Sequence, residues 1–174
     1  FWSVGGSWRL SEEKWMNARW IDNLTIKASY GVQGNDMLTT YYAWQGFYDL
    51  TWANALNPGA IVSTLENLDI SWEKKGTVNV GVEATLFNRI LDLSVEYYHS
   101  NTHDLLLASP MALSTGFQSY NANVGTMVNQ GVEATVRVNW LNREKFQANS
   151  TLMLYHNQNE VTALTASQDE IISS

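Results

Sequence analysis

Apolar and polar residues alternate along the chain, most clearly between residues 77 and 99. Every second residue is apolar from Val78 to Leu86, and the residues between them are polar or glycine. After Asn88-Arg89 the phase inverts, and the alternation continues from Leu91 to Tyr97. A period of two is typical of a strand with one apolar face and one polar face. The pattern therefore predicts two strands joined by a tight turn.

A two-residue turn at Asn88-Arg89 accounts for the inversion of phase. Such a turn pairs Phe87 with Ile90, and the pairs that follow bring all the apolar residues onto one face of the hairpin. Thr85 then lies opposite Asp92 on the polar face. A shift of one residue would mix the two faces, so the alternation specifies the register.

The alternation returns elsewhere in the chain, and part of one strand is repeated. The pentapeptide Gly81-Val-Glu-Ala-Thr recurs as Gly131-Val-Glu-Ala-Thr. We predict six strands, at about residues 1–10, 23–32, 71–87, 90–100, 130–140 and 145–156. Long loops at about 33–70 and 101–129 join strands at one end of the sheet, and short connections join them at the other. The predicted fold class is all-β, an antiparallel up-and-down meander of about six strands.

Two architectures fit this arrangement. An outer-membrane β-barrel has strands of about ten residues, short turns at one end, long loops at the other and aromatic residues at both edges of its apolar band. Aromatic residues of the apolar face lie near the short turns (Trp8, Trp140 and Phe146) and near the long loops (Trp2, Tyr30 and Tyr97). A soluble β-sandwich shows the same alternation, and it could bind carbohydrate through the aromatic residues of its loops. Periodicity alone leaves both architectures open.

Composition narrows the possible functions. The 174 residues include 10 basic and 17 acidic ones, and a net charge of -7 provides no basic surface for nucleic acid. No apolar run approaches the roughly 18 residues of a membrane-spanning helix. The absence of cysteine excludes thiolate zinc sites and cysteine nucleophiles. His99 and His103 have a spacing that converges on a helix and not at the end of a strand, so we predict no metal site, and we expect no cofactor.

Charged residues on the polar faces of the strands are the first candidates for chemistry. They are Lys27, Glu83, Asp92, Glu96, Glu133 and Arg137. A glycosidase would need two carboxyl groups at a defined separation, one of them in an apolar pocket, and the register places Glu83 diagonal to Glu96. These positions lie in the middle of strands, without such a pocket. We therefore interpret them as the hydrated wall of a lumen and predict that the protein is not an enzyme.

Aromatic residues crowd the two predicted long loops. Those that we single out as possible contacts for a ligand or partner are Trp44, Phe47, Tyr48, Trp52, Phe117 and Tyr120. Exposed aromatic side chains can stack on sugar rings or anchor a protein partner. The alternative is that they pack the loops against neighbouring segments.

Short motifs recur in order along nearly the whole chain. They include Trp8-Arg9-Leu10-Ser11-Glu12-Glu13, Tyr30-Gly31-Val32-x-Gly34-Asn35, Asn67-Leu68-Asp69-Ile70-Ser71-Trp72-Glu73, Asn79-Val80-Gly81-Val82-Glu83, Asn123-x-Gly125 and Asn129-x-Gly131-Val132-Glu133. In this order and spacing they resemble motifs of the SusC/RagA-like TonB-dependent outer-membrane transporters of Gram-negative bacteria, which import glycans or peptides. Leu68 stands where that family usually has proline, so the entry to the loop is less rigid here.

The resemblance implies an architecture and a set of partners. Members of the family form a barrel of about 22 strands, closed by a plug, energised by TonB and usually capped by a SusD-like surface lipoprotein. The chain would then be an internal segment of the barrel wall, 1–174, with the plug domain and the C-terminal end of the barrel absent from it. The parent protein would lie in the outer membrane, in contact with the lipid bilayer, and would import an oligosaccharide or peptide.

Overall fold

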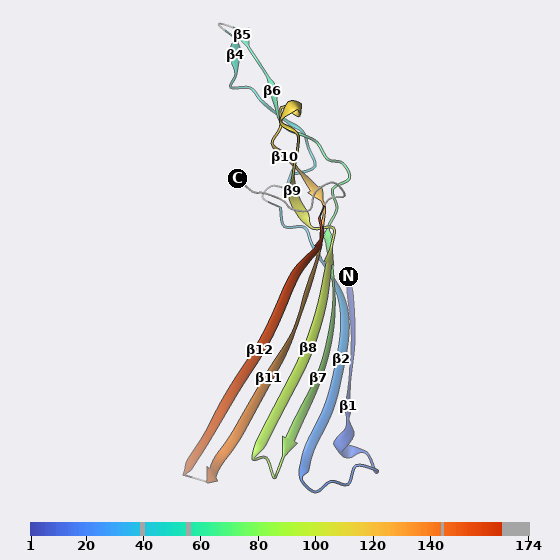
Figure 1. Cartoon of the computed structure of the whole chain (residues 1–174), viewed down its shortest axis with the longest axis vertical. Helices are drawn as coiled ribbons and strands as arrows, with labels where there is room; N and C mark the ends of the chain where they lie inside the picture. The colour runs from blue at the N-terminus through green and yellow to red at the C-terminus, as the bar shows by residue number, and fades with distance from the viewer. Residues whose placement is uncertain (39–40, 55–56, 144, 165–174) are drawn as a thin grey trace. The chain divides into compact units, whose positions relative to one another are not determined.

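A six-stranded sheet is the largest element of the computed structural model, which describes residues 1–38, 41–54, 57–143 and 145–164 (Figure 1). Long strands that follow each other in the chain are neighbours in the sheet, whose order is β1-β2-β7-β8-β11-β12. These strands are β1 (Trp2–Arg9), β2 (Ile21–Asn35), β7 (Glu73–Leu86), β8 (Leu91–His103), β11 (Thr126–Arg143) and β12 (Phe146–Ala163). The predicted all-β meander is confirmed.

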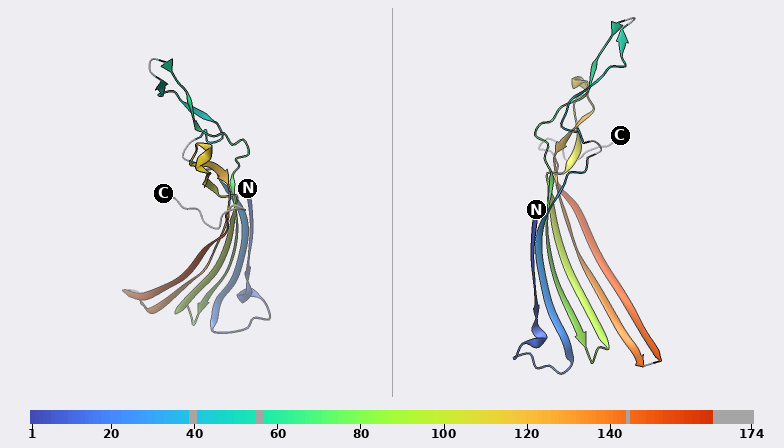
Figure 2. Two further views of the ribbon diagram at one scale, coloured as in Figure 1. Left: turned by 45° about the horizontal axis from the view of Figure 1, so that its top comes forward. Right: turned by 180° about the vertical axis from the view of Figure 1, so that it is seen from behind.

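The chain divides into two compact units. The first comprises Phe1–Gln33, Gly76–Asn101 and Val128–Glu160, and its strands form a single curved layer (Figure 2). The second comprises Gly34–Lys75, Thr102–Met127 and the residues from Val161 onward. The two predicted long loops contribute most of the second unit.

Short strands structure the segments that the sequence marks only as loops. They are β3 (Phe47–Asp49), β4 (Ala53–Asn54), β5 (Asn57–Pro58), β6 (Ile61–Thr64), β9 (Leu106–Pro110) and β10 (Ser119–Asn123). β3 pairs with β6, β4 with β5, and β9 with β10. Two turns of 3-10 helix, η1 (Leu10–Glu12) and η2 (Leu113–Thr115), complete the described elements. Among the described residues, no helix is both long enough and apolar enough to cross a membrane.

The pairing of β1 with β2 shows how the alternation sorts side chains. Trp2 lies opposite Val32 and Trp8 opposite Ile26, so apolar residues share one face. Ser7 lies opposite Lys27 on the other face. Because successive side chains of a strand point to opposite faces, this register makes one face of the sheet apolar and the other polar.

The turn between β7 and β8 differs from the predicted two-residue turn. β7 ends at Leu86 and β8 begins at Leu91, so Phe87 and Ile90 lie in the turn and do not form the last strand pair. The backbone is left-handed from Phe87 to Arg89, with φ angles of 56°, 58° and 63°. Phe87 leaves the strand to stack on Trp20, with ring centroids 5.8 Å apart, and its N–H donates to the Trp20 carbonyl. A contact distant in sequence therefore accompanies the change of turn.

The register beyond this turn agrees with the prediction. The Thr85 hydroxyl donates to the Asp92 carboxylate over 2.9 Å, which places the two side chains opposite each other on the polar face.

No second sheet covers the apolar face within the described residues. The buried apolar residues are only Ala43, Ala84 and Ala122 among them. Many large apolar side chains on this face are at least a third exposed: Trp2, Val4, Trp8, Ile26, Tyr30, Val78, Val80, Val82, Val95, Tyr97, Val132, Trp140, Phe146, Leu152 and Leu154. The long strands form one sheet. They therefore do not form the two facing sheets that the β-sandwich alternative requires.

Candidate functional site

Lys27 is the centre of a charged cluster on the polar face. Its Nζ lies 2.7 Å from Glu83 Oε1 and 3.3 Å from Glu96 Oε2, so one ammonium group joins β2, β7 and β8. The three side chains are between 39% and 46% exposed, and neither carboxylate lies in the apolar pocket that a general acid requires. The cluster brings together three of the predicted wall residues, and it has the character of a solvated surface.

Gly81 makes room for this cluster. A Cβ atom at position 81 would lie 2.8 Å from Cε and 3.3 Å from Cγ of Lys27. The Lys27 side chain therefore crosses β7 at Gly81, where a side chain would obstruct it. This crossing is what lets an amine on β2 reach a carboxylate on β8.

Gly131, the equivalent residue of the repeated pentapeptide, has the same role one hairpin later. A Cβ atom there would lie 2.6 Å from the Tyr98 hydroxyl oxygen and would also contact the His156 carbonyl. The Tyr98 side chain crosses β11, and its hydroxyl accepts a hydrogen bond from Asn157 Nδ2 over 2.6 Å. The amide of Asn157 also donates to Asn129 Oδ1. The repeat thus marks two places where a long polar side chain bridges three strands.

The other predicted wall residues lie apart from the lysine cluster. Asp92 accepts hydrogen bonds from Thr85 and from Asn139 Nδ2, the latter over 3.3 Å. Arg137 lines a shallow hollow of about 520 Å³ together with Glu83 and Asp92. Glu133 is exposed. That this face borders a lumen stays a prediction.

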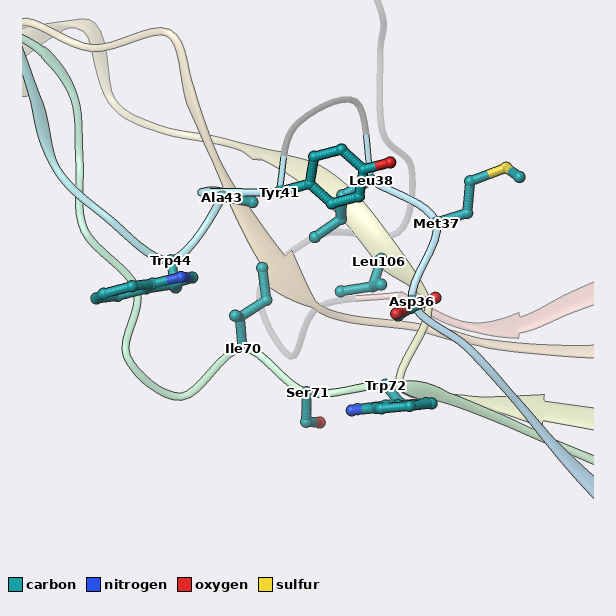
Figure 3. Close-up of a pocket in the computed structure, with 10 residues that line it drawn as sticks. All are labelled: Asp36, Met37, Leu38, Tyr41, Ala43, Trp44, Ile70, Ser71, Trp72 and Leu106. Atoms are coloured by element: carbon teal, nitrogen blue, oxygen red, sulfur yellow. The ribbon is translucent and has the colours of Figure 1, made fainter. Parts of the chain in front are cut away.

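A pocket of about 490 Å³ forms within the second unit (Figure 3). Its lining comprises Asp36, Met37, Leu38, Tyr41, Ala43, Trp44, Ile70, Ser71, Trp72 and Leu106. Trp44 is the one predicted contact residue that it includes. Trp72 and Leu106 come from the ends of the two long connections, so the pocket unites segments that are far apart in sequence.

The remaining predicted loop aromatics are distributed over other elements. Phe47 and Tyr48 belong to β3, where they pair with Thr64 and Val62 of β6. Tyr120 lies opposite Ser109 in the β9–β10 pair. Phe117 follows η2. Phe117 and Tyr120 are both half-buried. The structure does not gather these aromatics into one site, and their contact with a ligand or partner stays a prediction.

Trp52 is held by the turn that follows β3. Its indole N–H donates to Asp49 Oδ2 over 3.0 Å. The backbone N–H and the hydroxyl of Thr51 also donate to Asp49, and these bonds, with that from Trp52, lower the pKa of the Asp49 carboxyl below its ordinary value. The indole of Trp52 is therefore fixed at the surface, with 58% of the residue exposed.

Glu73, at the start of β7, fastens one side of the pocket region. Its Oε2 accepts a hydrogen bond from Asn35 Nδ2 over 2.8 Å, and its Oε1 accepts one from the backbone N–H of Leu106 over 2.9 Å. One carboxylate thus joins the end of β2 to the start of β9. The neighbouring residue, Lys74, forms an ion pair with Asp104, with 3.4 Å between Lys74 Nζ and Asp104 Oδ2.

Two asparagine side chains fasten the other side. Asn123 accepts from the Ser71 N–H over 2.6 Å, and its Nδ2 donates to the carbonyls of Ser71 and Asp104. Asn67 Nδ2 donates to the Asn121 carbonyl over 2.7 Å. Sequence reasoning missed this role, although the signal was available, because Asn67 and Asn123 both belong to the motifs that resemble a transporter family.

Histidine residues do not build a metal centre within the described part of the chain. His99 Nδ1 lies 3.3 Å from Gln130 Oε1, within hydrogen-bonding distance, and His103 is exposed at the end of β8. Across the described ranges, no three His, Asp or Glu side chains converge in a way that could hold a metal ion.

Comparison with known proteins places this arrangement in a family. The family described as TonB dependent receptor-like, beta-barrel matches residues 1–170. The chain is 32% identical over 158 residues to TonB-dependent receptor P39 of Formosa agariphila, covering 90% of the chain and 15% of that receptor. It is 24% identical over 175 residues to SusC of Bacteroides thetaiotaomicron, covering 96% of the chain and 17% of SusC.

Solved structures agree with the sequence relatives. A structure of the RagAB peptide transporter superposes with a TM-score of 0.85 at 30% identity, over 96% of this chain and 18% of the other. The RagAB peptide importer in its closed-closed state gives a TM-score of 0.87 at 29% identity, over 98% and 19%. The chain thus spans less than a fifth of the length of these relatives. It belongs to the TonB-dependent receptor-like β-barrel family, as a SusC/RagA-like member.

Proposed function

We propose that the chain forms part of the wall and loops of an outer-membrane TonB-dependent transporter that imports nutrients such as oligosaccharides or peptides. The remaining strands and a plug domain belong to the rest of a longer protein in this proposal, because the chain spans 15% of the length of receptor P39. TonB energises transport through the plug. The chain itself carries out no chemical step.

The uncovered apolar face is the observation that carries this proposal. Val80, Val82 and Val95 are between 36% and 42% exposed in the middle of the sheet, and in water such a surface would drive aggregation. A lipid bilayer covers it without that cost. The opposite face bears the solvated Lys27 cluster, as a water-filled lumen requires.

Aromatic side chains at both ends of the apolar face support the same placement. Towards the short turns, the Trp140 indole N–H donates to Ser150 over 2.9 Å, and that of Trp8 donates to Glu13 over 2.8 Å. Towards the long connections, Trp2 and Tyr30 pack edge to face with centroids 5.4 Å apart. Tryptophan and tyrosine favour the two interfaces of a membrane, where one end of the side chain is apolar and the other is hydrated.

A SusD-like surface lipoprotein is the partner that we propose for the second unit. Tyr48, Leu50 and Trp52 are 66%, 72% and 58% exposed around the β3–β6 pair. Exposed aromatic residues of this kind are typical anchors of protein interfaces. The similarity to SusC and RagAB is consistent with such a partner.

Uptake measurements test the proposed function. Full-length protein in the outer membrane of a Gram-negative host should import labelled oligosaccharides or peptides only when TonB is present, because the plug must be displaced by TonB in each cycle. Binding of the substrate at the cell surface should persist without TonB, which serves as the control for correct assembly. Uptake that continues at the same rate in cells without TonB would contradict the proposal.

A further inference from the structure

The pocket of the second unit has a distinctive lining. Three aromatic side chains, Tyr41, Trp44 and Trp72, surround it, and four aliphatic or thioether side chains, Met37, Leu38, Ile70 and Leu106, complete its apolar surface. Asp36 and Ser71 supply a carboxylate and a short hydroxyl group, in addition to the Tyr41 hydroxyl and the two indole N–H groups, and none of the described lining residues is basic. In Figure 3, Asp36 and Trp72 lie on one side of the pocket and Trp44 on the other. Trp72 is 52% exposed.

We propose that this pocket binds the basic side chain of an extended peptide, an arginine or a lysine with an apolar neighbour. The inference rests on the proposed function and specifies its substrate class. The alkyl stem of a basic side chain packs on apolar surface while its head remains polar. A guanidinium or ammonium group next to Asp36 forms a charge-assisted hydrogen bond, and the Trp72 indole, drawn on the same side of the pocket as Asp36, offers an aromatic surface to the cation or its alkyl stem (Figure 3).

The charge of the second unit favours a cation. Its described segments contain six acidic residues, Asp36, Asp49, Glu66, Asp69, Glu73 and Asp104, and two basic ones, Lys74 and Lys75, which is a formal charge of -4. Glu73 and Asp104 are already engaged, with Asn35 and Leu106 and with Lys74 respectively. Asp36 is exposed. A surface of one sign concentrates ligands of the other sign.

A sugar ring fits the lining less well. Each pyranose carries several hydroxyl groups, and a hydroxyl that loses water without gaining a partner weakens binding. Besides the Tyr41 hydroxyl and the two indole N–H groups, Asp36 and Ser71 carry the polar side chains among the described lining residues, and the backbone N–H and carbonyl of Ser71 are bonded to Asn123. An anionic glycan would also meet the negative charge of the unit.

Hydrogen bonds hold two parts of the pocket lining, at Ser71 and at Trp44. Asn123 holds Ser71 through two hydrogen bonds. The backbone carbonyl of Trp44 accepts a third from the backbone N–H of Asn67, over 3.0 Å. Ala43 is 4% exposed at the base. A pocket with fixed walls loses less conformational freedom on binding, and it therefore binds more tightly than a mobile one.

Peptide binding to the full-length protein in detergent tests the inference. Fluorescence anisotropy compares a labelled pentapeptide with a central arginine next to leucine, the same peptide with glutamine for arginine, and a neutral maltooligosaccharide. We expect the arginine peptide to bind about two- to fivefold more tightly than the glutamine peptide, because water screens an ion pair with the exposed Asp36 carboxylate. Asp36→Asn should remove this difference, and Trp72→Ala should weaken both peptides.

The matched control is Asp69→Asn, which removes an exposed carboxylate of the same unit outside the pocket lining and should preserve the preference for arginine. Equal binding of the two peptides by the unchanged protein would overturn the inference, even if a variant failed to fold. So would maltooligosaccharide binding that is lost in Trp72→Ala without any peptide binding. TonB-dependent uptake that survives these results would leave the proposed function standing while the pocket assignment failed.

Discussion

Replacing Val95 by arginine should prevent the full-length protein from assembling in the outer membrane. Val95 lies on the apolar face of β8 and is 36% exposed there. A lysine or arginine on the lipid face of a membrane barrel costs about 2–4 kcal/mol near the midplane, which is a large part of the stability of a typical domain. Folding can be measured as the shift in gel migration between unheated and boiled samples, and by urea unfolding in lipid vesicles.

Ser94→Arg is the matched control for this prediction. Ser94 is the neighbouring residue, and it borders the hollow of the polar face together with Arg137. Arginine there can remain hydrated, so the variant should fold nearly as the unchanged protein does. If both variants folded equally well, the apolar face would not border lipid.

Gly131→Ala should destabilise the sheet by about 1–3 kcal/mol, the usual cost of overpacking. The added methyl group would contact the backbone carbonyl of His156 and would lie 2.6 Å from the Tyr98 hydroxyl oxygen. The carbonyl belongs to β12 and cannot turn away, so β12 must shift, and the Tyr98 hydroxyl must also move, which weakens its hydrogen bond with Asn157. Urea unfolding of the full-length protein in vesicles, with a lowered midpoint, checks this.

Gly81→Ala, the same change in the other copy of the repeat, provides the comparison. Its methyl group would meet Cε of Lys27 at 2.8 Å, near the end of a flexible side chain that can move aside. The loss of stability should be clearly smaller, although the contact of Lys27 with Glu96 should weaken. Equal losses of stability in the two variants would show that the contact with the His156 carbonyl does not cause the destabilisation in Gly131→Ala.

The local alternation of apolar and polar residues predicts most of the fold, because each long strand has one apolar face and one polar face. The alternation from Val78 to Leu86 fixes which side chains share a face, and the Thr85–Asp92 hydrogen bond agrees with the register that follows from it. The turn was predicted less well. Its shape depends on the stacking of Phe87 on Trp20, and no pattern within the hairpin indicates that contact.

The candidate site was less predictable than the strands. The sequence identifies Trp44 as an aromatic residue of a loop, but the pocket also includes Trp72 and Leu106, which the chain brings to it from two other segments. Hydrogen bonds made by Glu73 and Asn123 hold those segments together. Such contacts join residues about 30 to 50 positions apart, and periodicity reports only on neighbours within one strand.

Electron paramagnetic resonance tests the central claim, that lipid covers one face of the sheet and water the other. Single spin labels are placed in the full-length protein in vesicles at Leu91, Asp92, Leu93, Ser94, Val95, Glu96 and Tyr97. Labels at the odd-numbered positions should be relaxed mainly by oxygen, which partitions into lipid, and labels at the even-numbered positions mainly by a water-soluble nickel complex. Uniform access of the nickel complex to all seven positions would contradict the account.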